Sequence, residues 1–320
     1  MTKYRAAVIG LGIMGRRMIA NFMRHPQFTL SGVWDPAAAA QDATAEEFPE
    51  VTLAPDAGSL IADRETDLVY IACPPQWHKE YALAAIDAGK PIYCEKPLGT
   101  DIGDSEDLVA RLEAAAAPNV VNFVQASCEA LELTQAALAS GAIGEVVGVD
   151  IVVQYQQWPR AWQVAADWLR FRDQGGYTRE VISHFVFVTE RLLGPAKLVW
   201  TRPTYPGDAT LCETHMQARL DCGGVPVSVF GSAGGIGPDR QEVTIWGGKQ
   251  SHRISDFYFL GVTGGDAWTS GLPPDADPRV TTLQRQLDNV AKWLGGEAHT
   301  LPSARDALSV QKIVEAMLEV

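Results

Sequence analysis

The sequence predicts an α/β domain followed by an α+β domain. With 320 residues, the chain exceeds what one hydrophobic core usually supports, so we expect two domains. Apolar strand patterns alternate with helical patterns over the first third, which is typical of βαβ units and a parallel sheet. From about residue 125 the strands alternate apolar and polar residues and follow one another, as in an antiparallel sheet. We therefore place the domains at residues 1–124 and 125–320.

Composition argues against several classes of partner. Hydrophobic residues make up 47% of the chain and charged residues 20%, as in an ordinary soluble protein. The net charge of −13 and a pI of about 4.9 argue against binding nucleic acid or an anionic membrane surface. No apolar run reaches the ~18 residues that span a bilayer. The first residues, Met1 to Arg5, lead directly into a predicted strand, so we expect no signal peptide.

The five cysteines are odd in number and lack C-x-x-C spacing. We expect reduced thiols in a cytoplasmic protein, without a disulfide framework. His, Asp and Glu show no metal-ligand spacing either, so we expect no metal. Redox chemistry in this chain would then depend on an organic cofactor.

In the first domain, we predict strands at residues 6–9, 29–34, 51–53, 68–72, 91–94 and 120–124. Between them we predict helices at residues 16–25, 36–47, 78–88 and 105–117. In the second domain, we predict strands at residues 146–154, 196–202, 211–221, 225–232, 241–246 and 253–259. Helices are predicted there at residues 129–140, 179–193, 282–293 and 303–318, and the last two could pack back on the first domain.

A glycine-rich stretch follows the first predicted strand. It reads Gly10-Leu11-Gly12-Ile13-Met14-Gly15 and leads into the first helix. In a dinucleotide-binding Rossmann domain, the first glycine permits a tight turn, the second lets the backbone approach the pyrophosphate, and the third lets the helix pack closely on the strand. The free N–H groups of the helix would hold the phosphates. We therefore expect Gly10, Gly12, Ile13, Met14 and Gly15 to contact a nicotinamide dinucleotide.

Asp35 ends the second strand, 20 residues beyond Gly15, where this fold places an acceptor for the adenosine ribose hydroxyls. A carboxylate there repels the 2′-phosphate of NADP, so we predict NAD, with NADP less favoured. In the alternative interpretation, Asp35 caps a helix before Pro36. Arg16 and Arg17 on the first helix could still reach a phosphate.

Further polar groups follow two buried strands. Cys73 and Pro74 follow one of them, and Glu95 and Lys96 follow the next, the fifth predicted strand. Such sheets bind ligands beyond the carboxyl ends of their strands. A lysine there could donate to a substrate oxygen and stabilise the alkoxide-like charge that develops during hydride transfer. Glu95 could bond the nicotinamide ribose or pair with Lys96, and the alternative for Lys96 is a solvated surface lysine.

Three segments together carry a family resemblance: residues 10–15, Ala72-Cys73-Pro74-Pro75-Gln76-Trp77-His78, and Ala88-Gly89-Lys90-Pro91-Ile92-Tyr93-Cys94-Glu95-Lys96-Pro97-Leu98. Through them, and through residues 141–146 and 307–310, the chain resembles the glucose–fructose oxidoreductase / inositol dehydrogenase family, often called Gfo/Idh/MocA. The resemblance implies a Rossmann domain, a second domain with a large open, mostly antiparallel sheet, and a cis bond before Pro97. It also implies homodimers or homotetramers formed through that sheet, a position near the cofactor for His78, and activity on sugars, inositols and related polyols.

The resemblance also implies a general acid/base at His184. The matching stretch is Gln174-Gly175-Gly176-Tyr177-Thr178-Arg179-Glu180-Val181-Ile182-Ser183-His184. Glu180 stands where the family usually has Asp, Gln174 replaces a glycine, and Ile182 replaces a small residue. The family often carries a basic residue just after the last Rossmann strand, but residues 121–126 contain none.

The residues themselves also favour His184. Glu180 and His184 are four positions apart on a predicted helix, so their side chains would be neighbours. Near a helix N-terminus the dipole disfavours imidazolium and leaves a neutral ring to accept a proton. Glu180 could orient that ring, pair with Lys96, or make an ordinary helix-surface contact.

Aromatic and basic side chains gather shortly before this helix, at Trp158, Arg160, Trp162, Arg170 and Arg172. Tryptophan faces stack on sugars and arginine grips carboxylates, so we expect this group to contact the substrate. The alternative is aromatic packing with solvated arginines. Two inward-pointing arginines would indicate an acidic or strongly polar substrate.

The sequence thus predicts an NAD-dependent oxidoreductase that transfers a hydride between nicotinamide C4 and a carbinol carbon of a sugar, inositol or related polyol. We assign Lys96, His184 and Glu180 to the chemistry. One alternative is a reductase of the same fold acting on an imine, keto-acid or dihydrodiol. Another is a dinucleotide-binding sensor without turnover, although a sensor needs no proton acceptor.

Overall fold

The computed structural model describes residues 3–273 and 277–319 of the chain. Met1 and Thr2, which enter the prediction about a signal peptide, lie outside the described residues. The chain divides into two compact units. The N-terminal unit comprises Met1–Phe123 and Leu287–Leu308, and the C-terminal unit comprises Val124–Gln286 and Ser309–Val320.

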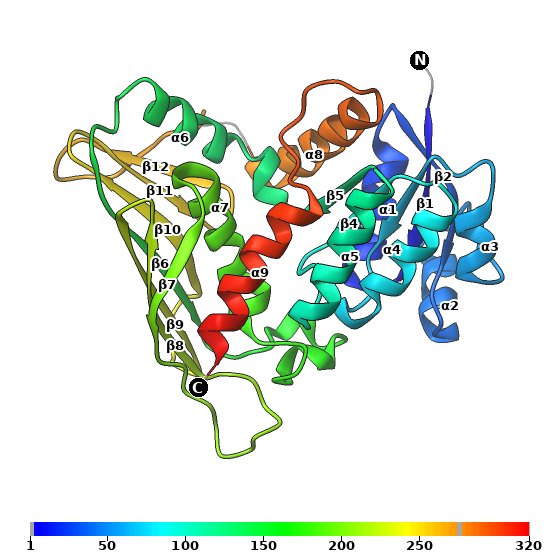
Figure 1. Ribbon diagram of the computed structural model, residues 1–320, viewed down its shortest axis with the longest axis horizontal. Coiled ribbons are helices and arrows are strands. Elements are labelled where there is room, and N and C mark those ends of the chain that lie inside the picture. Colours follow the sequence, from blue (N-terminus) through cyan, green and yellow to red (C-terminus); the bar gives the residue numbers. More distant parts are fainter. Residues whose placement is uncertain (1–2, 274–276, 320) are drawn as a thin grey trace. The chain divides into compact units, whose positions relative to one another are not determined.

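The N-terminal unit is built on a parallel sheet in the order β2-β1-β3-β4-β5 (Figure 1). The strands are short and mostly apolar, and most of their residues are buried, as expected of parallel strands. Because β2 and β3 lie on opposite sides of β1, the strand order reverses there, which is where such sheets bind ligands. The strands are β1 (Tyr4–Ile9), β2 (Phe28–Trp34), β3 (Leu68–Ile71), β4 (Ile92–Glu95) and β5 (Asn119–Asn122).

Helices connect these strands. They are α1 (Ile13–Arg24), α2 (Ala38–Glu47), α3 (Ala57–Ala62), α4 (His78–Asp87) and α5 (Ile102–Ala114). α1 packs against β1 and β2, and α4 packs against β3 and β4. The carboxylates of Asp56 and Asp101 accept backbone N–H groups in the first turns of α3 and α5, which stabilises both helix starts.

Two predictions for this unit are wrong. Residues 51–53 do not form a strand, because only Leu53 makes an isolated bridge, to Val33. Lys96 therefore follows the fourth strand of the sheet and not a fifth. The short helix α3 was not predicted, since six residues are too few to show a helical period.

The C-terminal unit holds an eight-stranded sheet in the order β13-β12-β11-β10-β6-β9-β8-β7. Figure 1 draws its strands in green to yellow. β6 and β9 pair in parallel, and the other neighbours are antiparallel. The predicted fold class is therefore confirmed. The strands are β6 (Val146–Tyr155), β7 (Ala196–Thr201), β8 (His215–Cys222), β9 (Val225–Ala233), β10 (Arg240–Gly247), β11 (Ser251–Ser255), β12 (Phe259–Thr263) and β13 (Thr269–Ser270).

The helices of this unit lie against the sheet. α6 (Glu129–Ala139) packs on β11, and α7 (Ser183–Leu193) packs on β7 and β8. The predicted helix at 179–193 begins instead as a π-helical turn, Thr178–Ile182, which continues into α7.

One predicted strand of this unit is two strands, and another starts late. The single strand predicted at 253–259 is the hairpin of β11 and β12. Its turn uses Asp256 and Phe257 at φ angles of 47° and 69°, without the glycine that usually marks such a turn. The strand predicted from Leu211 begins only at His215.

The chain ends in α8 (Pro278–Leu294) and α9 (Ala304–Leu318), and the division between the units falls inside both helices. Within the N-terminal unit, the segment before α9 lines the outer edge of β5. The N–H of Val121 donates to the carbonyl of Pro302 at 2.9 Å, and Asn119 Oδ1 accepts the N–H of Ala304 at 2.9 Å. No helix among the described residues is long and apolar enough to cross a membrane.

Candidate active site

The glycine-rich loop brings backbone into contact with backbone. Gly10 has a φ of +97°, and a Cβ there would lie 2.5 Å from the backbone nitrogen of Cys73. A Cβ on Gly15 would lie 1.9 Å from the carbonyl oxygen of Gly10. Both positions therefore require glycine, the first for its conformation and both for lack of space.

The start of α1 suits an anion. Gly12 is its N-cap residue, no described side chain caps the helix, and its first turn contains no acidic residue. The first N–H groups of a helix have no acceptor within the helix. Apart from Gly12 and its two chain neighbours, no described residue has an atom within 4 Å of the Cβ position of Gly12, so the backbone is open beside those N–H groups. Ile13 and Met14, which begin the helix, are half-buried. This arrangement fits the pyrophosphate of a dinucleotide.

Asp35 lies at the end of β2 and holds the loop in place. Its Oδ2 accepts the N–H of Leu11 at 2.7 Å, and its Oδ1 accepts the N–H of Ala37 at 2.8 Å, just before α2. Each carboxylate oxygen can accept a second hydrogen bond. Asp35 thus both ties the helix start to the loop and retains acceptor capacity for a ribose hydroxyl.

His78 begins α4, and its ring is fully buried. Nε2 lies 2.9 Å from the carbonyl oxygen of Cys73, and Nδ1 lies 2.9 Å from that of Pro97. Burial lowers the pKa of His78 to about 4, so the ring is neutral at neutral pH and carries one N–H. His78 therefore links the segment after β3, where Cys73 precedes Pro74, to Pro97 in the turn after β4.

Glu95 is the last residue of β4, and Lys96 follows it. Glu95 is buried and accepts hydrogen bonds from the hydroxyl of Tyr70 and, at 2.6 Å, from the amide of Asn122. Burial raises the pKa of the Glu95 carboxyl. The bond between Lys96 and Pro97 is cis, and Lys96 is half-buried. The neighbouring strands thus fix Glu95, while Lys96 keeps an exposed part at the strand end.

His184 is the second residue of α7 and is buried in the C-terminal unit. Its Nδ1 lies 2.7 Å from Oε1 of Gln125, and its ring meets that of Phe257 edge to face at a centroid distance of 5.3 Å. No local pattern predicts Gln125 as this partner, because it lies 59 residues from His184 in the chain.

The geometry around Glu180 differs from the prediction. Glu180 belongs to the π-helical turn, where the i, i+4 spacing of an α-helix no longer holds. The partner of His184 Nδ1 is Gln125 rather than Glu180. Glu180 itself is half-buried.

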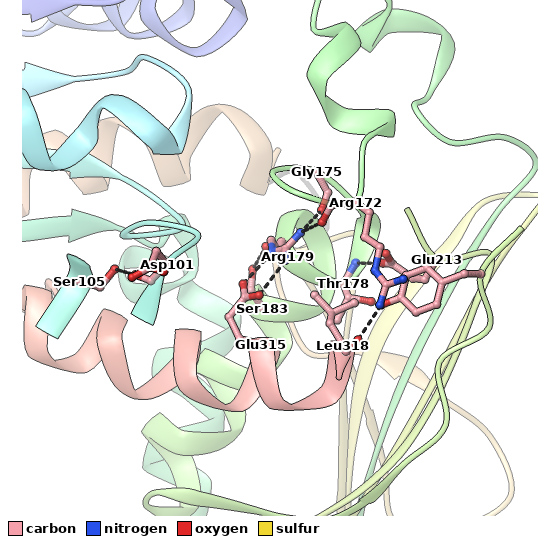
Figure 2. Close-up of polar contacts among 11 residues, drawn as sticks. Asp101, Ser105, Arg172, Gly175, Thr178, Arg179, Ser183, Glu213, Glu315 and Leu318 are labelled. Carbon is pink, nitrogen blue, oxygen red and sulfur yellow. Dashed lines mark hydrogen bonds and ion pairs between the residues drawn. The ribbon is translucent and has the colours of Figure 1, made fainter. Parts of the chain in front are cut away.

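Buried charges hold the loop that precedes α7 (Figure 2). Arg179 makes a two-pronged pair with Glu315 of α9 at 2.6 and 2.7 Å, and both side chains are at most 12% exposed. Arg179 also donates to the carbonyl oxygens of Arg172 and Gly175 at 2.6 and 2.9 Å. The sequence did not indicate this ion pair.

Glu213 supports the same loop and was also missed. Its Oε1 accepts the N–H of Thr178 at 2.8 Å (Figure 2), and its pKa is raised by burial. A Cβ on Gly176 would lie 2.5 Å from Glu213 Oε2, and a Cβ on Gly175 would lie 2.2 Å from the carbonyl oxygen of Leu169. The paired glycines therefore let the carboxylate and the neighbouring backbone approach the loop.

Trp158 and Arg160 are engaged within the C-terminal unit. The indole of Trp158 donates to the carbonyl oxygen of Leu169 at 2.9 Å. The guanidinium of Arg160 lies 4.8 Å from the ring centre of Tyr155 and 4.7 Å from that of Trp162, which is 50% exposed. Of the two indoles Trp158 and Trp162, Trp162 is thus the more exposed.

The two remaining arginines are also engaged. Arg170 pairs with Asp167 at 2.7 Å and lies over Phe171. Arg172 lies over the ring of Tyr205 at 3.8 Å. Among the described residues, no group of three or more His, Cys, Asp or Glu side chains could hold a metal ion.

Comparison with known proteins agrees with the fold of the N-terminal unit. Residues 4–123 match the profile of the Gfo/Idh/MocA family, described as an oxidoreductase family with an NAD-binding Rossmann fold. Over residues 4–123, this chain therefore resembles that family. The family resemblance inferred from the motifs is therefore confirmed.

A curated relative is inositol 2-dehydrogenase from Mycolicibacterium gilvum, which is 32% identical over 146 residues. The match covers 45% of this chain and 42% of that enzyme, so the chain spans less than half the length of this relative.

Solved structures resemble the whole chain. An oxidoreductase from Agrobacterium radiobacter, in complex with NAD⁺, L-tartaric acid and magnesium, has a TM-score of 0.82 at 22% identity and covers 98% of this chain and 95% of its own. The WlbA dehydrogenase from Bordetella pertussis, in complex with NADH and UDP-GlcNAcA, has a TM-score of 0.82 at 21% identity and covers 99% and 94%. These likenesses show the fold.

Proposed function

We propose that this protein is an NAD-dependent dehydrogenase acting on a carbinol carbon of a sugar, inositol or related polyol. The observation that carries the proposal is the hydrogen bond of His184, whose Nδ1 faces an amide oxygen and so bears the N–H of a neutral ring, which would make Nε2 the proton acceptor. The inositol 2-dehydrogenases among its relatives support the substrate class.

The N-terminal unit would hold the cofactor. The N–H groups at the start of α1 would bind its pyrophosphate, and Asp35 would bind the adenosine ribose. NAD, when bound, supplies the hydride acceptor. The carboxylate of Asp35 would repel the 2′-phosphate of NADP, so we expect a higher kcat/KM with NAD. A clear preference for NADP would overturn this choice of cofactor.

Three side chains would act on the substrate. The ammonium of Lys96 would stabilise the charge on the reacting oxygen, and Nε2 of His184 would take its proton. Glu180 would tune one or both groups. We propose Trp158, Arg160, Trp162, Arg170 and Arg172 as substrate contacts, with Trp162 the best exposed indole.

Kinetics of Lys96→Met, His184→Asn and the double variant would test these roles. We expect each single change to lower kcat by about 100- to 10,000-fold, while the Kd for NAD changes little. The double variant should lose much less than the product of the single losses, because both groups would serve one transition state. An equal loss of NAD binding would contradict the roles. A panel of sugars, inositols, keto-acids and imines would identify the substrate class, and NADH binding without turnover on any of them would favour a sensor.

We also propose a homodimer or homotetramer formed through the C-terminal sheet. Strand register places three half-exposed aromatic side chains on the same face, opposite the buried one: Trp200, Phe230 and Trp246. Exposed aromatic groups of this kind mark protein interfaces. Light scattering of wild type and Phe230→Asp would test the assembly, and an unchanged mass would contradict it.

The five free thiols support a cytoplasmic location.

A further inference from the structure

Gln125 lies in a short 3-10 helix, Val124–Ser127, and its side chain is fully buried. We propose that Gln125 is a positioning residue that fixes the protonation site of His184. The inference rests on the proposed role of His184 as the proton acceptor, and it assigns to a neutral amide the orienting role that the sequence suggested for Glu180.

The contact fixes one tautomer of the ring. An amide oxygen only accepts hydrogen bonds, so at 2.7 Å from Gln125 Oε1 the Nδ1 of His184 must be the donor. A neutral imidazole carries a single N–H, and Nε2 is therefore the nitrogen that bears no proton. The edge-to-face contact with Phe257 restricts rotation of the ring, so the lone pair keeps its direction.

A glutamine has a different effect on the ring from a carboxylate. A negative charge beside His184 would favour imidazolium and raise its pKa, whereas the amide orients the ring without adding charge. The elements around this pair carry three nearby carboxylates: Glu180 in the turn before α7, Glu129 at the start of α6, and Asp256 beside Phe257. Asp256 already accepts the amide of Gln241 at 2.7 Å.

The other end of the Gln125 amide argues against a purely structural role. Its Nε2 is buried and has no hydrogen-bond partner among the described residues. A buried donor without a partner lowers stability, and an apolar residue of similar shape would avoid that cost. The oxygen bonded to His184 is the feature that explains a glutamine at this position.

Two variants of the full-length protein would test the proposal, Gln125→Met and Gln125→Glu. Methionine has a similar shape and cannot accept this bond, whereas glutamate keeps the oxygen and adds charge. Thr134→Val is the matched control, because Thr134 Oγ1 bonds Nδ1 of another buried histidine, His252, at 3.0 Å. The measurements are nitrogen-15 NMR of the histidine rings, which reports the tautomer without turnover, and the pH dependence of kcat.

We expect wild-type His184 to carry its proton on Nδ1. Gln125→Met should mix the tautomers and lower kcat by about 10- to 100-fold, with the KM for NAD unchanged. Gln125→Glu should keep the tautomer, restore most of kcat at high pH, and raise the pH at which activity appears by about 1 unit or more. Thr134→Val should change only the His252 signals.

Unchanged His184 signals and kcat in Gln125→Met would overturn the proposal. If that variant fails to fold, Gln125→Glu decides instead, since the absence of an upward shift in the titration of His184 would equally overturn it. If no substrate is turned over at all, the proposed function fails, but the NMR result still decides whether Gln125 sets the tautomer.

Discussion

At the glycine-rich end of the N-terminal unit, the structure depends on backbone packed against backbone, with Gly15 directly on Gly10. Around the start of the His184 helix, it depends on buried charges, namely the pair of Arg179 with Glu315 and the carboxylate of Glu213. The first region can be disrupted by adding a single methyl group. The second has close contacts at Gly175 and Gly176 too, but it can also be disrupted by a change of charge or hydrogen bonding that adds no volume.

The glycine-rich end should therefore be sensitive to added side-chain volume, whereas the ion pair should be sensitive to the loss of one charge. Close backbone contacts cannot relax around a new side chain, because neither partner has a rotamer to change. A buried ion pair, in contrast, stabilises only while both partners remain, since a single buried charge is poorly solvated. Substitutions in the two regions should therefore fail for different reasons.

The largest expected effect comes from Arg179→Met. It leaves Glu315 charged and buried, and we expect the free energy of unfolding to fall by about 3–5 kcal/mol. Denaturant unfolding of the variant would measure this loss. The double variant Arg179→Met/Glu315→Leu should recover part of the stability, because no lone charge then remains.

The matched control is the exposed pair of Arg305 with Glu113, whose side chains are 63% and 51% exposed. Arg305→Met should leave unfolding almost unchanged, because solvent screens such pairs. If this change cost as much as Arg179→Met, burial would not be what distinguishes the two pairs.

A smaller loss is expected at the glycine-rich end. Gly15→Ala places a methyl carbon 1.9 Å from a backbone oxygen, and we expect a loss of about 3 kcal/mol in unfolding free energy. Gly12→Ala meets no described atom within 4 Å, so its thermal unfolding should match wild type. Its affinity for NAD should fall, because the methyl group would keep the pyrophosphate away from the backbone N–H groups at the start of α1. Equal Tm losses in both variants would contradict the assignment of separate roles.

The smallest effect concerns pH. Burial raises the pKa of Glu213 above its ordinary value of 4.5, so the folded protein holds this proton more tightly than the unfolded chain. The free energy of unfolding should therefore fall as pH rises from 4.5 through the raised pKa.

Glu213→Gln removes this titration and still offers an acceptor for Thr178. At about pH 7 the variant should be more stable than wild type, by about 1.4 kcal/mol for each unit of the raised pKa, and the difference should shrink near pH 4. Thermal unfolding across this range is the measurement. If both proteins showed the same pH dependence, Glu213 would already be ionised without cost.

The contrast also explains how much of the molecule could be predicted from sequence. The parallel sheet, the glycine-rich loop and the residues at strand ends follow from local patterns, because each strand and its loop are continuous in sequence. The strand expected at 51–53 failed because a short apolar run does not specify a pairing partner. The turn at Asp256 and Phe257 was missed because it uses positive φ angles without glycine.

The support of His184 could not be predicted in the same way. Gln125 lies 59 residues from His184, Glu213 lies 35 residues from Thr178, and Glu315 lies 136 residues from Arg179. Nothing in the local sequence marks these partners, because an isolated glutamine or glutamate usually lies on a solvated surface. The π-helical turn has no dependable signature either, so the spacing from Glu180 to His184 was interpreted as α-helical.

The hydrogen bond from Val121 to Pro302 has a consequence for biosynthesis. The segment that covers the outer edge of β5 is made just over 180 positions after that strand, so a nascent chain emerging from the ribosome carries this edge uncovered for much of translation. An exposed strand edge is a template for aggregation. A chaperone that binds the nascent chain would therefore protect this edge during the interval. Slowing elongation between β5 and α9 should therefore lower the yield of native protein.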